Sequence, residues 1–194
     1  RDIGSSGDDA GGTQAYGIND KGQVTGRSSG PGFAHAFLYS NGQMIDIDPT
    51  GSHEGSFGYA INSTGEVTGV ALSGGFGADQ RAHAFLYSNG RMVDIGTLGG
   101  VNSLGLALND SGEVTGSSDL ASVVSQHITV THAFLYSGGT MRDIHGGAFV
   151  GSSGLAINAA GQVVGRAYTA FDPSGNRTSP HGFIYTDGEM YDLN

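Results

Sequence analysis

Cysteine is absent from this chain of 194 residues. Disulfide bonds and thiolate metal sites are therefore excluded, because both need the cysteine sulfur. Basic residues are also few, since eight lysines and arginines stand against 18 aspartates and glutamates, for a formal net charge of −10. A chain this acidic is repelled by nucleic-acid phosphates and by anionic lipid headgroups. We therefore expect neither nucleic acid nor a membrane as a direct partner.

Long apolar segments are missing as well, and no run of 18 apolar residues could span a bilayer. The sequence has no amino-terminal methionine and no signal-like apolar segment, so we expect a processed, trimmed or partial chain. Glycine, in contrast, contributes 36 residues, while charged residues make up only 13%. This balance is typical of tight turns between packed strands rather than of long solvated helices. The composition predicts an all-β protein.

One motif occurs four times along the chain. HAFLYSNGQMIDI begins at His35, and related segments begin at His83, His132 and His181. A repeat of about 49 residues is typical of modules that stack on their neighbours. We assign residues 1–13 to a leading strand and linker, and the repeats to residues 14–48, 49–95, 96–144 and 145–194.

Two turn signals divide each repeat into four strands. The pattern Asn-x-x-Gly, first seen at Asn19 and Gly22, predicts a type I turn with a glycine bulge between the first two strands. Between the third and fourth strands, two-residue pairs predict type I′ turns. These pairs are Asn41-Gly42, Asn89-Gly90, Gly138-Gly139 and Asp187-Gly188.

Apolar side chains occupy both faces of the third strand, because His, Phe and Tyr of HAFLY point one way while Ala and Leu point the other. A sheet with two apolar faces must be covered on both sides. Burying Phe37 contributes roughly 1.5 to 3 kcal/mol only if a neighbouring sheet covers it. We therefore predict a β-propeller-like array of four blades, each a four-stranded antiparallel sheet of about 48 residues. The repeat length disfavours a β-solenoid, and the repeat count disfavours a trefoil.

The segments between the second and third strands differ among the repeats, at residues 27–34, 70–82, 117–131 and 166–180. Variable loops on a constant scaffold often carry binding specificity. The last segment is the richest in aromatic and polar groups. Its candidate ligand contacts are Tyr168, Phe171, Asp172, Asn176 and Arg177. A glycan is the ligand class that we consider for this surface.

The combination of HAFLYS, GxMxDI, the link DIGTLGG and the turn INxxGxVTG resembles the HAF repeat, or probable extracellular repeat, of exported bacterial proteins and some autotransporter passengers. The resemblance covers nearly the whole chain. It implies a secreted or cell-surface β-propeller-like array, and it brings no catalytic residues. The fourth copy departs from the pattern with Gly182 in place of alanine and with the link DIHGGAF in place of DIGTLGG.

One histidine per repeat at an equivalent position invites a metal interpretation. We favour a structural latch between blades, because a group that recurs in every blade is expected of a packing role. The latch pairs each histidine with the aspartate of the fourth strand, and its members are His35, His83, His132 and His181 with Asp46, Asp94, Asp143 and Asp192. We expect no metal and no other cofactor.

Weak calcium binding stays open as an alternative at three looser acidic positions. These positions are Asp8 with Asp9, Asp48, and Asp172 with Asn176. The Asn-x-x-Gly turns, two of which contain Asp20 and Asp110, lack the alternating carboxylates and terminal glutamate of a calcium-binding loop, and turn chemistry explains them.

The chain begins with a fourth strand at Arg1, Asp2 and Ile3 and ends with another at 191–193. This surplus strand has two explanations: the chain is cut from a longer array, or the strand adds to the sheet of another copy. The second explanation predicts assembly by strand addition into rings or filaments. No nucleophile elbow, Ser/His/Asp pattern or phosphate-binding loop is found, so we expect no enzymatic activity. The expected function is a non-enzymatic, extracellular structural or adhesive β-propeller that forms homo-oligomers. A carbohydrate- or other ligand-binding propeller is the alternative.

Overall fold

A computed structural model describes residues 12–29, 32–48, 54–75, 79–121, 130–147, 149–172, 174 and 176–194. The expected assembly strand, Arg1 to Ile3, lies outside these residues, and so do Asp8 and Asp9. The described residues form four sheets of four antiparallel strands and contain no helix, and hence no helix able to cross a membrane.

Each sheet is one blade, and its strands pair in chain order. Blade 1 consists of β1 (Thr13–Ile18), β2 (Val24–Ser29), β3 (Ala34–Ser40) and β4 (Gln43–Asp46). Blade 2 consists of β5 (Ser56–Ile61), β6 (Val67–Ser73), β7 (Arg81–Ser88) and β8 (Arg91–Asp94). Blade 3 consists of β9 (Gly99–Leu108), β10 (Val114–Leu120), β11 (Thr131–Ser137) and β12 (Thr140–Asp143). Blade 4 consists of β13 (Gly151–Ile157), β14 (Val163–Phe171), β15 (Arg177–Thr186) and β16 (Glu189–Asp192).

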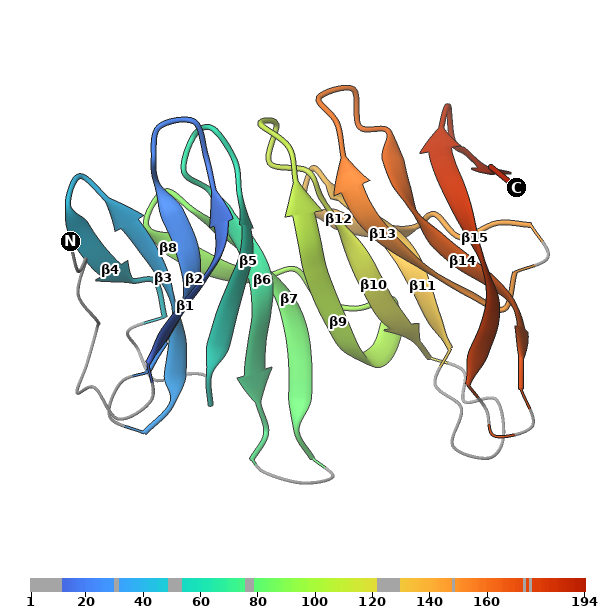
Figure 1. The fold of residues 1–194 in the computed structure, drawn as a ribbon. Helices are drawn as coiled ribbons and strands as arrows, with labels where there is room; N and C mark the ends of the chain where they lie inside the picture. Colours follow the sequence, from blue (N-terminus) through green and yellow to red (C-terminus); the bar gives the residue numbers. More distant parts are fainter. Residues whose placement is uncertain are drawn as a thin grey trace.

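The four blades stand side by side in chain order as an open row, with blade 1 and blade 4 at opposite ends (Figure 1). This arrangement confirms the predicted all-β, propeller-like array of four blades.

Both predicted turn types are present. The N–H of Gly22 donates to the carbonyl of Asn19 at 3.0 Å, and Gly22 has a φ of 71°. The Oδ1 atom of Asn19 accepts the backbone N–H groups of Lys21 and Gln23 at 3.1 and 3.0 Å. Asn41 and Gly42 have φ values of 52° and 82°, as a type I′ turn requires.

Apolar side chains are buried between blades. Leu38 and Ile47 of blade 1 pack against Val67 and Phe85 of blade 2. The same faces meet between blades 2 and 3 and between blades 3 and 4. We call the side of a blade that carries Leu38 and Ile47 the forward face, and the side that carries Val67 and Phe85 the backward face. Each internal contact joins a forward face to the backward face of the next blade.

A threonine–glycine pair lets the inner strands of neighbouring blades approach closely. Thr25 is fully buried and donates to the carbonyl of Phe37 at 2.8 Å. Gly58 lies across the contact, and a Cβ atom there would be 2.2 Å from Thr25 Oγ1. The same pairing recurs at the next two contacts, with distances of 2.2 and 2.1 Å. Its members there are Thr68 with Gly105 and Thr115 with Gly154.

The segment 166–180, predicted as a loop, is mainly a β-hairpin. Strand β14 runs to Phe171 and β15 begins at Arg177, and these two residues pair with each other. The N–H of Asp172 donates to the carbonyl of Asn176 at 2.8 Å and closes the turn. Tyr168, Thr169 and Phe171 favour extended backbone, which explains why the strands continue past the point where the repeats diverge.

Candidate functional site

Each blade carries one histidine–aspartate hydrogen bond. The Nδ1 atom of His35 lies 2.9 Å from Oδ2 of Asp46, and the other three pairs span 2.7 to 2.8 Å. These pairs are His83–Asp94, His132–Asp143 and His181–Asp192. Both members belong to one blade, on its third and fourth strands. The pair therefore joins adjacent strands of one sheet. We had expected a latch that connects one blade to the next, and the pair does not make that connection.

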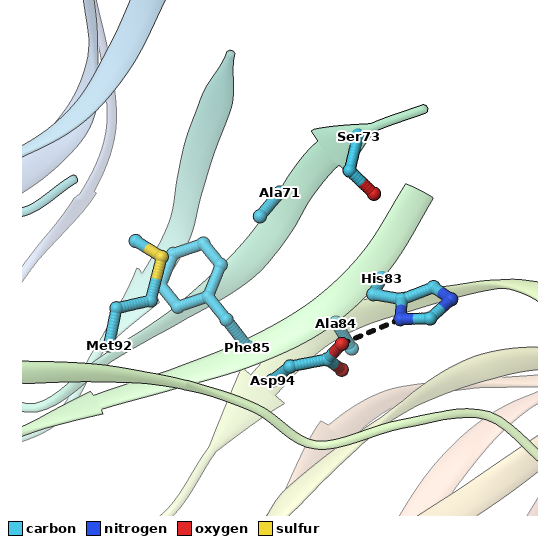
Figure 2. A pocket seen from close by; sticks show the side chains of 7 residues that line it. All are labelled: Ala71, Ser73, His83, Ala84, Phe85, Met92 and Asp94. Carbon is cyan, nitrogen blue, oxygen red and sulfur yellow. Dashed lines mark hydrogen bonds and ion pairs between the residues drawn. The ribbon is translucent and has the colours of Figure 1, made fainter. Parts of the chain in front are cut away.

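The same aspartates turn the chain at the end of the fourth strand. Oδ1 of Asp94 accepts the N–H of Gly96 at 2.7 Å, and the other three aspartates accept the N–H two residues later. His83 and Asp94 border a cavity of about 20 Å³ beside Phe85 and Met92 (Figure 2). A space this small holds no more than a water molecule. The described residues contain no cluster of three or more histidines or acids able to hold a metal.

Two of the candidate ligand contacts stack on each other. The guanidinium of Arg177 lies over the ring of Tyr168, 5.6 Å from its centroid, and donates a hydrogen bond to Thr131 of blade 3. Phe171 pairs with Arg177 in the strand register. The hydrogen bond to Thr131 fastens the hairpin of blade 4 to blade 3.

Asp172 and Asn176 form the turn of the same hairpin. Oδ1 of Asp172 accepts the backbone N–H groups of Ser174 and Asn176 at 2.9 and 2.8 Å. Its Oδ2 atom accepts the side-chain amide of Asn176 at 3.0 Å. The structure thus brings the five candidate residues together in one hairpin, where they contact one another.

A shallow groove of about 430 Å³ lies between blades 3 and 4, and Glu113, Arg142 and Tyr185 help to line it. The Arg142 guanidinium stands over the Tyr185 ring at 6.0 Å. The Glu113 carboxylate accepts hydrogen bonds from Asn109 and Ser137 at 2.7 and 3.0 Å. Glu113 and Arg142 therefore serve packing within blade 3 and against blade 4.

A histidine pair lies in the link between blades 3 and 4. The rings of His132 and His145 stack with centroids 3.7 Å apart. Nε2 of His145 is 3.1 Å from the carbonyl of Phe149, and Nδ1 is 2.8 Å from Oγ of Ser152. Since a carbonyl only accepts, Nε2 carries the proton and Nδ1 accepts from the serine. Ser152 is buried, and its hydroxyl also accepts the N–H of Ala133 at 2.9 Å, so the His145 imidazole serves the packing between blades 3 and 4.

A ladder of asparagine side chains crosses the whole array. Nδ2 of Asn19 donates to the carbonyl of Asn62 at 2.8 Å, Asn62 to that of Asn109 at 3.0 Å, and Asn109 to that of Asn158 at 3.0 Å. The sequence indicated only turns at these positions. The signal for the ladder was the asparagine that stays constant in four turns whose middle residues vary.

The ladder has open ends. Nδ2 of Asn158 donates to Gln162 at 2.7 Å, but no carbonyl of a further blade stands beside it in the described part of the chain. At the other end, the carbonyl of Asn19 accepts only the N–H of Gly22 in its own turn among the described residues.

The forward face of blade 4 is exposed where the other forward faces are buried. Val164 is 42% exposed, while the threonines at its position in blades 1 to 3 are 0% exposed. Leu193 is 62% exposed, while the isoleucines at its position are at most 6% exposed. Leu155 and Tyr191 are further exposed apolar side chains of this blade.

The backward face of blade 1 is exposed along its first strand. Five of the six residues of β1 are exposed, and Ile18 reaches 71%. In β5, which blade 1 covers, every residue is buried or half-buried. Phe37, on the outer part of the same face of blade 1, is buried. The first strands therefore form the open part of this end.

The described residues form an open β-propeller-like array with one contact repeated three times, and they leave uncovered the forward face of blade 4 and the first strand of blade 1. An acylaminoacyl peptidase from Pyrococcus horikoshii matches 94% of this chain with a TM-score of 0.55 and 14% identity, and this chain spans 27% of that protein. A protein described as a gluconolactonase matches 100% of this chain and 65% of its own length, but its TM-score is 0.45 at 16% identity. No family model and no curated protein matches the sequence.

The expectation that the chain is not an enzyme is wrong, because the fold is shared with an enzyme, the peptidase. The absence of a contiguous motif did not justify that expectation, because catalytic groups on such folds can come from separate loops. At 14% identity, the similarity shows the fold alone, so the activity of the peptidase is not transferred to this chain.

Proposed function

We propose that this chain is a self-associating β-propeller module whose end blades join one copy to the next. The observation that carries the proposal is the forward face of blade 4, where Val164 and Leu193 are exposed at positions that the other blades bury. Apolar surface gains about 25 cal/mol for each Å² removed from water, so covering this face is favourable.

Two uncovered surfaces suit a head-to-tail contact. One is the forward face of blade 4, and the other is the first strand on the backward side of blade 1. They lie at opposite ends of the row (Figure 1). A head-to-tail contact closes into a ring or extends into a filament, depending on the rotation between copies. The resemblance to the HAF repeat supports a place outside the cell or on its surface, and a structural or adhesive role for the assembly.

Sedimentation velocity over a wide range of protein concentration tests this proposal. The wild-type chain is expected to form species larger than a monomer as concentration rises. Val164→Glu is expected to shift the chain to monomer, because the contact would bury an unpaired charge. Val93→Glu is the matched control, since Val93 is 41% exposed but lies in blade 2, away from both ends. A wild-type monomer at every concentration, or equal effects of the two variants, would overturn the proposal.

A further inference from the structure

We propose that the contact between copies is a weakened form of the internal contact between blades, in which Asn158 extends the asparagine ladder onto Asn19 of a second copy. This inference rests on the proposed self-association and specifies its geometry.

Three kinds of hydrogen bond cross an internal contact. The turn asparagine of one blade donates to the turn carbonyl of the next, as Asn62 does to Asn109 at 3.0 Å. The N–H of Ala36 donates to Oγ of Ser56 at 2.9 Å, and this bond recurs at the next two contacts. Between blades 2 and 3, the N–H of Ser63 also donates to Oδ1 of Asp110 at 2.9 Å.

The end blades carry the donors and acceptors for all three. At the forward face of blade 4, the equivalent donors are the amide of Asn158 and the N–H groups of Gly182 and Ala159. At the backward face of blade 1, the equivalent acceptors are the carbonyl of Asn19, the hydroxyl of Thr13 and the carboxylate of Asp20. This match favours a second copy as the occupant of the open face.

In the same contact between copies, Arg166 of one copy would meet Gln14 of the other. The guanidinium of Arg27 lies 5.2 Å from the ring centroid of Phe57 across the first internal contact. Arg166 takes the position of Arg27 in blade 4, and Gln14 takes the position of Phe57 in blade 1. Within blade 1 the Gln14 amide oxygen accepts the Arg27 Nε–H at 3.0 Å and the Tyr16 hydroxyl at 2.6 Å, so Arg166 of a second copy would replace one of these donors.

One pair of residues at the open ends differs from its equivalents at the internal contacts, and this difference weakens the contact between copies. Val164 replaces the buried threonine, and Ala15 replaces the glycine that faces it. A Cβ atom on that glycine would lie 2.1 to 2.2 Å from the threonine oxygen in the internal contacts. Carbon atoms need roughly 3.5 to 4.0 Å, so the methyl group of Ala15 holds two copies apart. The contact between copies is therefore weaker than the contacts between blades. It forms at high protein concentration and dissociates at low concentration.

Restoring the internal pair is expected to tighten the joint. In the double variant Ala15→Gly with Val164→Thr, the dissociation constant measured by sedimentation equilibrium should fall by about tenfold or more, because overpacking of this size costs roughly 1 to 3 kcal/mol. Ala107→Gly removes the same methyl group from the first strand of blade 3 and is the matched control. A dissociation constant unchanged in the double variant would overturn the inference.

Disulfide trapping reports the geometry directly, because the chain has no cysteine of its own. A Cβ atom on Gly154 would lie 3.3 Å from the Cβ atom of Thr115 in the internal contact, so the equivalent positions of two copies, Ala15 and Val164, come within reach of a disulfide. Mixing Ala15→Cys with Val164→Cys under mild oxidation should give a cross-linked pair, and the double variant should give a series of longer species. If Val164→Cys alone cross-links as fast as the mixture, two blade-4 faces meet each other, and the inference fails while self-association stands. Monomers by sedimentation and no cross-link would mean that the proposed function itself fails.

Discussion

At the scale of residues, the turn asparagine links its own turn to the next blade. The Oδ1 atom of Asn62 accepts the N–H groups of Thr64 and Glu66 at 3.1 and 2.9 Å. Its amide donates both to Glu66 at 2.7 Å and to the carbonyl of Asn109 at 3.0 Å. Both amide hydrogens and the carbonyl oxygen are thus satisfied, which explains why asparagine occupies this position in every repeat.

Asn62→Ala is expected to lower the free energy of unfolding by about 2 to 4 kcal/mol, because buried donors and acceptors lose their partners. Asn158→Ala removes the same turn bonds but no bond to a further blade. It should cost about 1 kcal/mol less than Asn62→Ala. Urea unfolding at concentrations where the chain is monomeric measures both. Equal costs would show that the ladder bond contributes nothing to stability.

At the scale of elements, the link between β12 and β13 differs from the other links. Between blades 2 and 3, Oγ of Ser103 donates to the carbonyl of Gly96 at 2.6 Å. Between blades 3 and 4, the imidazole of His145 takes the place of that carbonyl. Burial lowers the pKa of His145, and the neighbouring His132 lowers this pKa further. The stability of this link therefore depends on pH, because His145 accepts the Ser152 hydroxyl only while its imidazole is neutral.

Acidification is expected to destabilise the chain below about pH 6.5, the usual pKa of histidine. His145 stays neutral in the folded protein while the unfolded chain binds a proton there, so the unfolded state gains stability as the pH falls towards the lowered pKa of His145. His145→Gln should reduce this slope and keep an acceptor for Ser152. Urea unfolding between pH 8 and pH 5 measures the slope. A slope unchanged by the substitution would contradict the assignment.

A second loss of stability follows at lower pH, from Asp143. Burial raises the pKa of its carboxyl group, but hydrogen bonds from His132 and from the N–H of His145 outweigh burial, and the pKa lies below its ordinary value. The folded state therefore holds this carboxylate ionised, and the associated stability is lost only as the pH falls below the ordinary value of 3.8. The two losses are separated in pH and so can be distinguished.

At the scale of the whole molecule, charge opposes the proposed assembly. Each copy carries a formal charge of −10, with Lys21 as the only lysine. Like charges on two copies repel, and salt screens this repulsion over a Debye length of about 8 Å at physiological ionic strength.

Self-association is therefore expected to strengthen as sodium chloride rises from low to physiological concentration. Sedimentation equilibrium at several salt concentrations measures this change. The Ala15→Gly and Val164→Thr double variant is a useful comparison, because it changes packing and leaves the charge unchanged, so its salt dependence should parallel that of the wild type. Association that weakens with added salt would indicate that attraction between opposite charges, rather than apolar contact, holds the copies together.

The number of blades, the four strands of each and the two kinds of turn can be read from the sequence alone. These features are local, since Asn19 with Gly22 and Asn41 with Gly42 specify their turns within a few residues. Alternation along HAFLY also predicted that each sheet is covered on both faces. The pairing of His35 with Asp46 was anticipated, because the two strands are joined by a two-residue turn of known register.

How one blade meets the next is seen in the tertiary structure and not in the sequence. The acceptor of the Asn62 amide is a carbonyl 47 residues away, and Gly58 matters because Thr25 of another blade presses against it. The tertiary structure also shows that each histidine–aspartate pair lies within one blade and that the hairpin of blade 4 is longer than the sequence indicated. Such contacts depend on the distance and rotation between rigid sheets, which no turn motif encodes. For the same reason, the open faces at Val164 and β1 became visible only when the blades were set side by side.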